Sequence, residues 1–221
     1  IRKYELKKNE RIKEKIQPNE KEAYAKLKYV VAYGHQGTYI DLTDELKNDE
    51  LNWKAKKEHF TLYAVFVGKT GQHVKRAAPG GKGFTLDHYS SKAFENYVKP
   101  FDEVLPPFKN RIRAIFNDSY EVYGSNFTPE FFEKFEEYRG YDLKKHLPEL
   151  FSRMNTELAN RVKGDYRETL SDLLLNDFNK PWTDWANDYG FKTKLQAHGS
   201  PGNLIDLYAS ADIPECETFG S

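Results

Sequence analysis

The feature that most constrains the fold is a change of sequence pattern near residue 68. Before it, from Tyr29 to Val67, short β-branched and aromatic runs alternate with polar turns, which predicts a small antiparallel β unit. The predicted strands are Lys28–Tyr33, Thr38–Thr43, Leu51–Trp53 and Phe60–Val67. After it, strand-like and helix-like runs alternate, as is typical of parallel βα units. The sequence therefore predicts an α/β chain, with a β unit over residues 28–67 and a βα region over residues 68–221.

The βα region is consistent with two architectures. Helices are predicted over Ser91 to Leu105, Thr128 to Tyr138, Pro148 to Phe178 and Trp182 to Tyr189, and strands over Arg111–Phe116, Phe191–Ala197 and Ser210–Glu215. This alternation fits either a doubly wound sheet or a (β/α)8 TIM-like barrel. A full barrel needs about 250 residues, so a barrel built from residues 68–221 would be incomplete.

The first 27 residues and the overall composition narrow the possibilities further. Residues 1–27 alternate Lys and Glu with few apolar side chains, which predicts a charged helical or linker segment. Lys plus Arg equals Asp plus Glu at 34 each, and this balance argues against nucleic-acid or anionic-membrane partners. One cysteine, Cys216, excludes an intrachain disulfide framework. The 15 Tyr and 15 Phe predict a folded chain, and flat rings also suit sugar binding.

Polar runs follow the predicted strands, where barrel enzymes carry their chemistry. In Lys75–His88, glycines permit close backbone approach and a basic pair could hold a carboxylate or hydroxyls, but the spacing is not that of a phosphate loop. Phe116–Glu121 concentrates carboxylates, as glycoside hydrolysis requires. A carboxyl enclosed there by Tyr120 or Tyr123 would have a raised pKa, which suits a general acid. A structural turn and a structural cap are the respective alternatives.

Two further runs lie near the C-terminus. Gln196–Tyr208 offers His, Asn and Asp together, and a Ser-His-Asp triad could be built from Ser200, His198 and Asp206. That triad is disfavoured because no G-x-S-x-G elbow is present. In Ala211–Gly220, two glutamates two residues apart would share a side of an extended chain and could bind a divalent cation or share a proton. A solvated loop is the alternative.

Together these runs resemble the signature stretches of glycoside hydrolase family 106, the α-L-rhamnosidases. The matching stretches, in the family's order, are VKRAAPGGKGFTLDHYS, FNDSYEVYGSNFTPEF, DYRETLSDLLL and QAHGSPGNLIDLYASADIPECETFG. The resemblance covers Leu51 to Ser221. It implies an interior piece of a large, exported bacterial enzyme, secreted or periplasmic, with a (β/α)8 core. Such an enzyme cleaves terminal α-L-rhamnosyl residues from plant polysaccharides such as pectin, with inversion and with Ca2+ at the site. The implied partners are a rhamnose-containing oligo- or polysaccharide and the rest of the parent polypeptide.

The resemblance also assigns roles to residues. Glu121 resembles the general acid and Glu215 the base, with Glu217 as the rival base and the expected calcium ligand. The residues expected to hold sugar hydroxyls or the ion are Asp87, His88, Asn117, Asp118, Tyr120, His198, Asn203 and Asp206. Cys216 stands where the family pattern has Thr, and Lys82 where it has an acid, which puts the base's surroundings and a subsite in doubt.

Two alternatives to a rhamnosidase stay open. One is a non-catalytic carbohydrate-binding relative, and the other is a barrel glycosidase for a different sugar. We also expect a chain of this extent to be inactive on its own, because an incomplete barrel exposes strand edges.

Overall fold

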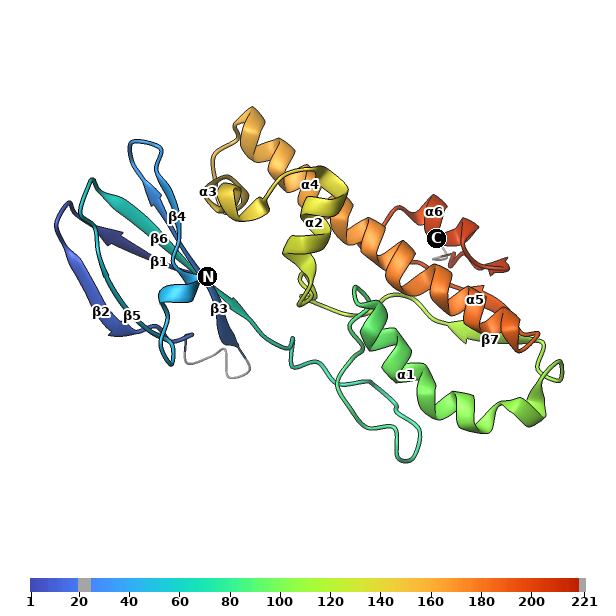
Figure 1. Cartoon of the computed structure of the whole chain (residues 1–221). Helices are drawn as coiled ribbons and strands as arrows, with labels where there is room; N and C mark the ends of the chain where they lie inside the picture. The colour runs from blue at the N-terminus through green and yellow to red at the C-terminus, as the bar shows by residue number, and fades with distance from the viewer. Residues whose placement is uncertain (20–24, 219–221) are drawn as a thin grey trace. The chain divides into compact units, whose positions relative to one another are not determined.

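The computed structural model describes residues 1–19 and 25–218, and the chain divides into two compact units. The first unit comprises Ile1–Gly71 with Lys144–Leu147, and the second comprises Gln72–Leu143 with Pro148–Ser221. The N-terminal strands of the first unit are blue to teal in Figure 1, and the helices of the second run from green to red.

The first unit is antiparallel β structure, as predicted. Its elements are β1 (Arg2–Leu6), β2 (Arg11–Lys15), β3 (Lys26–Gly34), β4 (Tyr39–Asp41), the 3-10 turn η1 (Thr43–Glu45), β5 (Glu50–Lys54) and β6 (Phe60–Val67). Four strands form a sheet in the order β1-β6-β3-β4, and β2 pairs with β5. All four strands expected between residues 28 and 67 are present.

The expectation of a charged helix or linker over residues 1–27 is wrong, because β1 and β2 lie there. Alternating charges also fit a strand in which every second side chain points to water. The few apolar side chains of this segment are then enough to reach the core, and Leu6, Ile12 and Ile16 are 5%, 8% and 1% exposed. The part of the predicted segment at residues 20–24 lies outside the described residues.

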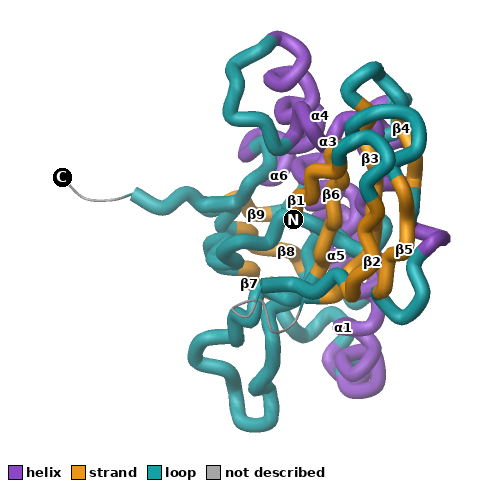
Figure 2. Tube along the Cα trace, turned by 90° about the vertical axis from the view of Figure 1, so that its left-hand side faces the viewer, coloured by secondary structure: helices purple, strands orange, loops and turns teal. Residues whose placement is uncertain are grey.

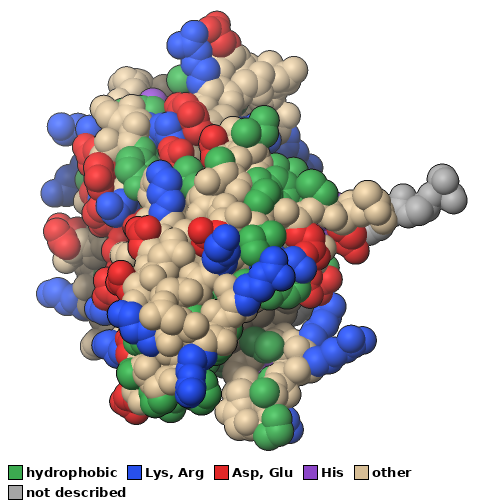
Figure 3. Space-filling model, turned by 90° about the vertical axis from the view of Figure 1, so that its right-hand side faces the viewer, with side chains coloured by type: hydrophobic (Ala, Val, Ile, Leu, Met, Phe, Trp, Pro, Cys, Tyr) green, Lys and Arg blue, Asp and Glu red, His purple; other side chains and the backbone are tan. Residues whose placement is uncertain are grey.

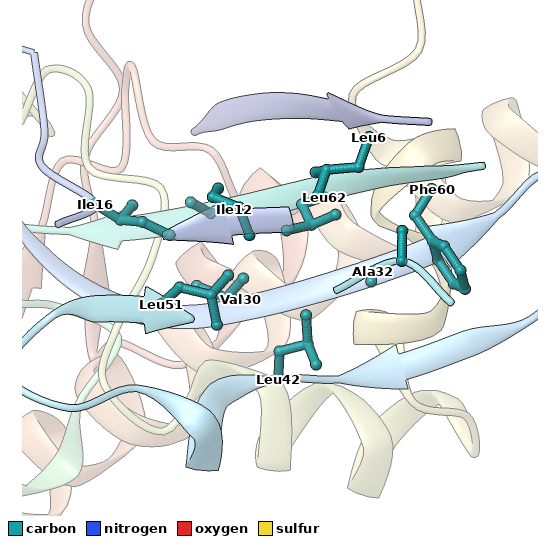
Figure 4. Packing of buried hydrophobic residues seen from close by; sticks show 11 residues of the cluster. Leu6, Ile12, Ile16, Val30, Ala32, Leu42, Leu51, Phe60 and Leu62 are labelled. Atoms are coloured by element: carbon teal, nitrogen blue, oxygen red, sulfur yellow. The ribbon is translucent and has the colours of Figure 1, made fainter. Parts of the chain in front are cut away.

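One hydrophobic core joins the two sheets of the first unit. It contains Leu6 from β1, Ile12 from β2, Val30 from β3, Leu51 from β5 and Leu62 from β6. Figure 4 shows these side chains converging from the separate strands. The N-terminal strands are therefore an integral part of this core.

A buried carboxylate, Glu58, lies beside this core and is only 5% exposed. It accepts a hydrogen bond of 2.5 Å from the Gln36 backbone N–H and another from the Thr38 hydroxyl. The Thr38 bond, joined by the Gln36 bond and by nearby positive charge, outweighs desolvation and holds the pKa of Glu58 below its usual range. Gly34 packs against the carboxylate with no room for a Cβ.

Parallel βα structure begins after Gly71. The elements from there are α1 (Ser91–Val104), the 3-10 turn η2 (Pro106–Phe108), β7 (Ala114–Asn117), α2 (Phe131–Arg139), the 3-10 turn η3 (Leu143–His146), α3 (Leu147–Leu150), α4 (Glu157–Leu173), the π-helical turn η4 (Leu174–Asn179), α5 (Lys180–Asp188), β8 (Lys192–Leu195), α6 (Leu204–Ala209) and β9 (Ile213–Pro214). β7, β8 and β9 form a parallel sheet in sequence order (Figure 2). Sequential parallel order occurs in a barrel and in one half of a doubly wound sheet, so three strands do not distinguish them.

Most predicted helices of the second unit are confirmed. Ser90 caps α1 by accepting from the Ala93 N–H at 3.3 Å, and α2 ends at Gly140, which adopts a left-handed conformation with φ of 77°. Thr128 does not cap α2, since its hydroxyl donates to Asp87 at 2.9 Å.

The single long helix predicted from Pro148 to Phe178 is wrong. The chain leaves helical structure after α3, and α4 starts anew at Thr156, whose hydroxyl accepts from the Ala159 N–H. Met154 and Leu158, which belonged to the predicted apolar stripe, are 68% and 49% exposed. Beyond α4 the helix does not stop, and α4, the π turn and α5 follow one another as a continuous rod (Figure 1).

Candidate functional site

A cavity of about 630 Å³ lies in the second unit, at the carboxyl ends of β7 and β8. Most of its wall comes from four segments: residues 72–76, the loop 117–122 after β7, the π turn, and residues 195–200 after β8. Thr85, His88 and Leu207 complete the lining. Parallel strands bring the loops at their carboxyl ends to one edge of a sheet, which explains why distant segments meet here.

The cavity gathers five of the predicted site residues. These are His88, Asn117, Asp118, Tyr120 and Glu121. Among the described residues that line it, Asp118 and Glu121 carry carboxylates. The run after β7 therefore lines a cavity, and the roles predicted for its individual residues stay predictions.

Glu121 is held at the rim of the cavity and is not enclosed by aromatic rings. Its side chain is 54% exposed and pairs with the Lys75 ammonium at 3.3 Å. Tyr123 is 66% exposed, and the Tyr120 ring lies against His88 with centroids 5.3 Å apart. The expected aromatic enclosure of the acid is therefore wrong for the described structure.

Gln72 anchors the backbone that carries Glu121. Its side-chain Nε2 donates to the Glu121 carbonyl at 2.5 Å, and its Oε1 accepts from the Tyr123 N–H at 2.8 Å. One amide thus satisfies two backbone groups two residues apart. Sequence reasoning missed Gln72 because a glutamine following a strand carries no distinctive signal.

The glycine-rich run folds as a hairpin beside the cavity. The Val74 N–H donates to Gly83 at 3.0 Å, and the Thr85 N–H donates to Gln72 at 3.0 Å. Lys75 and Arg76 from this hairpin line the cavity. The run therefore supplies basic side chains to the cavity lining, and the ligand expected for its basic pair stays a prediction.

His88 lies deep in the wall of the cavity. Its ring packs edge-on against Phe178 with centroids 4.5 Å apart. Desolvation lowers the pKa of His88 to about 4, against the opposing effect of a hydrogen bond with the Leu86 backbone. The imidazole is therefore neutral at physiological pH.

Asp87, the residue before His88, supports the structure around the cavity. Its carboxylate accepts from the Tyr89 N–H at 3.0 Å and from the Thr128 hydroxyl at 2.9 Å. Burial is the largest effect and raises the pKa of Asp87. These contacts join the start of α1 to the segment before α2, which is a positioning role.

The predicted residues after β8 take largely structural places. The His198 carbonyl accepts from the Tyr120 N–H at 2.8 Å, and the Asn203 side chain caps α6 by accepting from Ile205 at 3.0 Å. Asp206 is exposed in the first turn of α6. His198, Asn203 and Asp206 are absent from the described cavity lining, so their assignment to substrate stays a prediction. Ser200 Oγ has no hydrogen-bond partner among the described residues, so the disfavoured triad gains no support.

Glu215 follows β9 and continues its pairing, since its N–H donates to the Leu195 carbonyl at 2.9 Å. Its carboxylate forms an ion pair with Lys194, whose ammonium also lies 5.0 Å from the Phe116 ring centroid. Glu217 is exposed. Neither glutamate belongs to the described cavity lining. Because β7 and β9 are parallel in one sheet, the residues that follow them leave the same edge.

The calcium expected at Glu217 finds no ligand set in this part of the protein. Within residues 1–19 and 25–218, no three His, Cys, Asp or Glu side chains gather as a metal site would require. The described residues therefore do not fit the ion, and calcium stays a prediction.

On the face drawn in Figure 3, acidic, basic and hydrophobic side chains are interspersed.

Comparison with known proteins now decides the family. The sequence model of glycoside hydrolase family 106, described as alpha-L-rhamnosidase, matches residues 1–219. The chain belongs to this family. This confirms the resemblance carried by the polar runs. Family membership also makes the cavity at the ends of β7 and β8 the natural place to seek a glycosidase site.

Two similar proteins give the extent of the likeness. A Formosa agariphila protein named "Putative beta-glucuronidase" is 30% identical over 190 residues, which is 80% of this chain and 16% of that protein. The structure of a rhamnosidase from Novosphingobium sp. PP1Y matches with a TM-score of 0.67 and 29% identity, over 79% of this chain and 18% of that one. The chain thus spans less than a fifth of the length of either. None of its described helices is long and apolar enough to cross a membrane.

Proposed function

We propose that the polypeptide carrying this chain hydrolyses terminal α-L-rhamnosides, with Glu121 as the general acid. The observation that carries the proposal is the position of Glu121 in a cavity at the carboxyl end of β7, beside Asn117 and Asp118. Family membership and the solved rhamnosidase structure support the same reaction class.

Glycoside hydrolysis with inversion needs an acid that protonates the leaving oxygen and a base that activates water on the opposite face of the sugar. Such carboxyls stand about 6.5–9.5 Å apart. β7 and β9 are separated by one strand, and two strand spacings amount to about 9.5 Å, at the upper end of that range. This supports Glu215, after β9, as the proposed base, with Glu217 as its rival.

Both proposed carboxylates have cationic neighbours in the free protein. A general acid must carry a proton, so the contact between Glu121 and Lys75 has to open when substrate binds. Both side chains are more than half exposed, at 54% and 71%, and can separate easily. Glu215, by contrast, needs its negative charge, and Lys194 stabilises that charge.

The finer parts of the proposal rest on the family. We propose that the substrate is a plant polysaccharide such as pectin, that the enzyme is exported, and that it uses calcium held by residues outside the described set. We further propose that β7, β8 and β9 belong to a (β/α)8 barrel completed by the rest of a longer polypeptide. Their sequential parallel order is consistent with it.

The test is the substitution Glu121→Gln in the polypeptide that carries this chain. Removing a general acid lowers turnover of an aryl α-L-rhamnoside by about 10²–10⁴-fold, while sugar binding persists. Glu103→Gln, an exposed glutamate of α1, is the matched control and should leave turnover unchanged. Full turnover by Glu121→Gln would refute Glu121 as the acid.

A panel of aryl glycosides separates the alternatives. Turnover of an aryl β-D-glucuronide instead of the rhamnoside would favour the activity named for the Formosa relative. Saturable sugar binding without hydrolysis of any aryl glycoside would identify a non-catalytic relative.

A further inference from the structure

The segment that carries Glu121 has no regular structure of its own. In the described structure, residues 118–130, between β7 and α2, belong to no helix or strand. Glu121 and Tyr123 are exposed. The backbone groups of such a segment are held by individual hydrogen bonds and not by a ladder. The position of the proposed acid therefore depends on the few bonds that hold this backbone.

Gln72 supplies two of these bonds with one side-chain amide. Its Nε2 donates to the Glu121 carbonyl at 2.5 Å, and its Oε1 accepts from the Tyr123 N–H at 2.8 Å. A residue of a neighbouring parallel strand makes the same pair of bonds, to one carbonyl and to the N–H two residues later. The Gln72 side chain thus takes the place of a strand partner, and it can do so because an amide both donates and accepts.

Gln72 is itself fixed at the base of the glycine-rich hairpin. Its carbonyl accepts from the Thr85 N–H at 3.0 Å. The next residues on the two arms, His73 and Phe84, form an antiparallel bridge, and their rings lie with centroids 4.5 Å apart. The amide therefore extends from a closed hairpin and can hold the acid's segment in one place.

The same hairpin contacts the Glu121 carboxylate in a different way. Lys75 pairs with it at 3.3 Å, and the two side chains are 71% and 54% exposed. That contact has to open when the carboxyl turns to a leaving oxygen. The Gln72 bonds are made to the backbone, so they persist while the side chain turns.

We infer that Gln72 is a positioning residue for the general acid, which fixes the backbone at Glu121 and Tyr123 while the carboxyl delivers its proton. In that step the bond from the sugar carbon to the leaving oxygen breaks, that oxygen takes the proton of Glu121, and water supplies the new oxygen. A misplacement of about 1 Å can cost about 10²-fold in rate. The inference rests on the proposed function, because it requires Glu121 to be the acid.

Two rhamnosides with different leaving groups test this inference. Dinitrophenolate departs without a proton, whereas the oxygen of methyl α-L-rhamnoside must be protonated as it leaves. Gln72→Met keeps the length of the side chain and removes both amide bonds. In the polypeptide that carries this chain, it should lower kcat for methyl α-L-rhamnoside about 10–100-fold. It should lower kcat for dinitrophenyl α-L-rhamnoside less than about threefold, with KM unchanged for both.

The ratio of the two kcat values separates positioning from folding, because loss of folded protein lowers both in the same proportion. Gln36→Met is the matched control and should keep the ratio, since Gln36 is exposed and contacts Glu58 through its backbone N–H. Gln72→Asn is a second variant. Its amide is one methylene too short to reach both backbone groups, so the ratio should fall by a smaller factor.

Glu121→Gln in the same assay distinguishes the two ways of failing. It should lower the ratio more than either Gln72 variant does. If it does so while Gln72→Met and Gln72→Asn keep the ratio, or lose both activities equally, Gln72 has no positioning role and the acid stands. If Glu121→Gln itself keeps the ratio, the acid is wrongly assigned and the inference about Gln72 fails with it.

Discussion

The two units of this chain differ in how completely some of their buried polar groups are hydrogen-bonded. In the first unit, Glu58 is buried and its carboxylate is hydrogen-bonded by Gln36 and Thr38. In the second, Asn179, His88 and Ser200 each leave a buried atom unpaired in the cavity wall. A satisfied carboxylate favours the folded state, whereas unpaired groups oppose it. The contrast indicates that the first unit is built for stability and that the second reserves hydrogen-bonding capacity for a ligand.

The largest expected effect tests whether the first unit depends on its N-terminal strands. Ile16→Ala should lower the free energy of unfolding of the first unit by about 2–5 kcal/mol, because Ile16 is 1% exposed in the core. Hydrogen exchange followed separately in each unit measures it. Lys13→Ala, at an exposed position of β2, is the control and should change stability by less than about 0.5 kcal/mol. Equal effects of the two substitutions would contradict the core assignment.

The next effect concerns the pH dependence of the second unit. The pKa of His88 is about 4 in the folded state and 6.5 in the unfolded state, so only the unfolded chain gains this proton between those values. The second unit should therefore lose stability as the pH falls from 6.5, reaching about 3 kcal/mol at pH 4. Above pH 6.5 His88 should contribute no slope.

Denaturation of His88→Gln at several pH values checks this prediction. The variant should lack the slope that unsubstituted protein shows between pH 6.5 and 4. His59→Gln, at an exposed histidine of the first unit, should keep it. An unchanged slope in His88→Gln would show that another group is responsible.

The smallest effect tests the close packing around Glu58. A Cβ at Gly34 would overlap the Glu58 carboxylate, which would have to leave its donors. Gly34→Ala should therefore destabilise the first unit by about 1–3 kcal/mol, the usual cost of overpacking. Gly164→Ala is the matched control, since it lies within α4 with open space around it and should stabilise that helix by about 0.5–1 kcal/mol. Thermal denaturation of both variants is the measurement.

Local sequence patterns predicted most elements of the fold. They failed at the charge-rich residues 1–27 and at the predicted long helix from Pro148 to Phe178. The strands from Lys26 to Val67 followed from β-branched and aromatic runs with polar turns. β1 and β2 were missed because their apolar residues are few, and burial against β5 and β6 depends on contacts distant in sequence. Met154 continued a helical stripe but lies in the break before Thr156, where local capping decides the structure.

The candidate site was predictable as a region but not as an arrangement. The run from Asn117 to Glu121 stood out because carboxylates follow a strand, and the structure places it in the cavity. The partners of those residues were not predictable. Lys75, Gln72 and Asn179 come from a hairpin and a π turn whose positions depend on tertiary packing, and a buried asparagine resembles any other in sequence.

The π turn also fixes the rotational phase of the rod formed by α4 and α5. Each residue of an α-helix advances the side-chain direction by about 100°. A π turn accommodates one additional residue without breaking the rod, so it offsets everything after it by that step. Deleting one residue between Leu174 and Asn179 would therefore restore a regular helix and rotate α5, including Trp182, relative to α4. The orientations of α5, which packs on β8, and of Asn179 in the cavity wall therefore both depend on this one π turn. A change that rotates one of them also rotates the other.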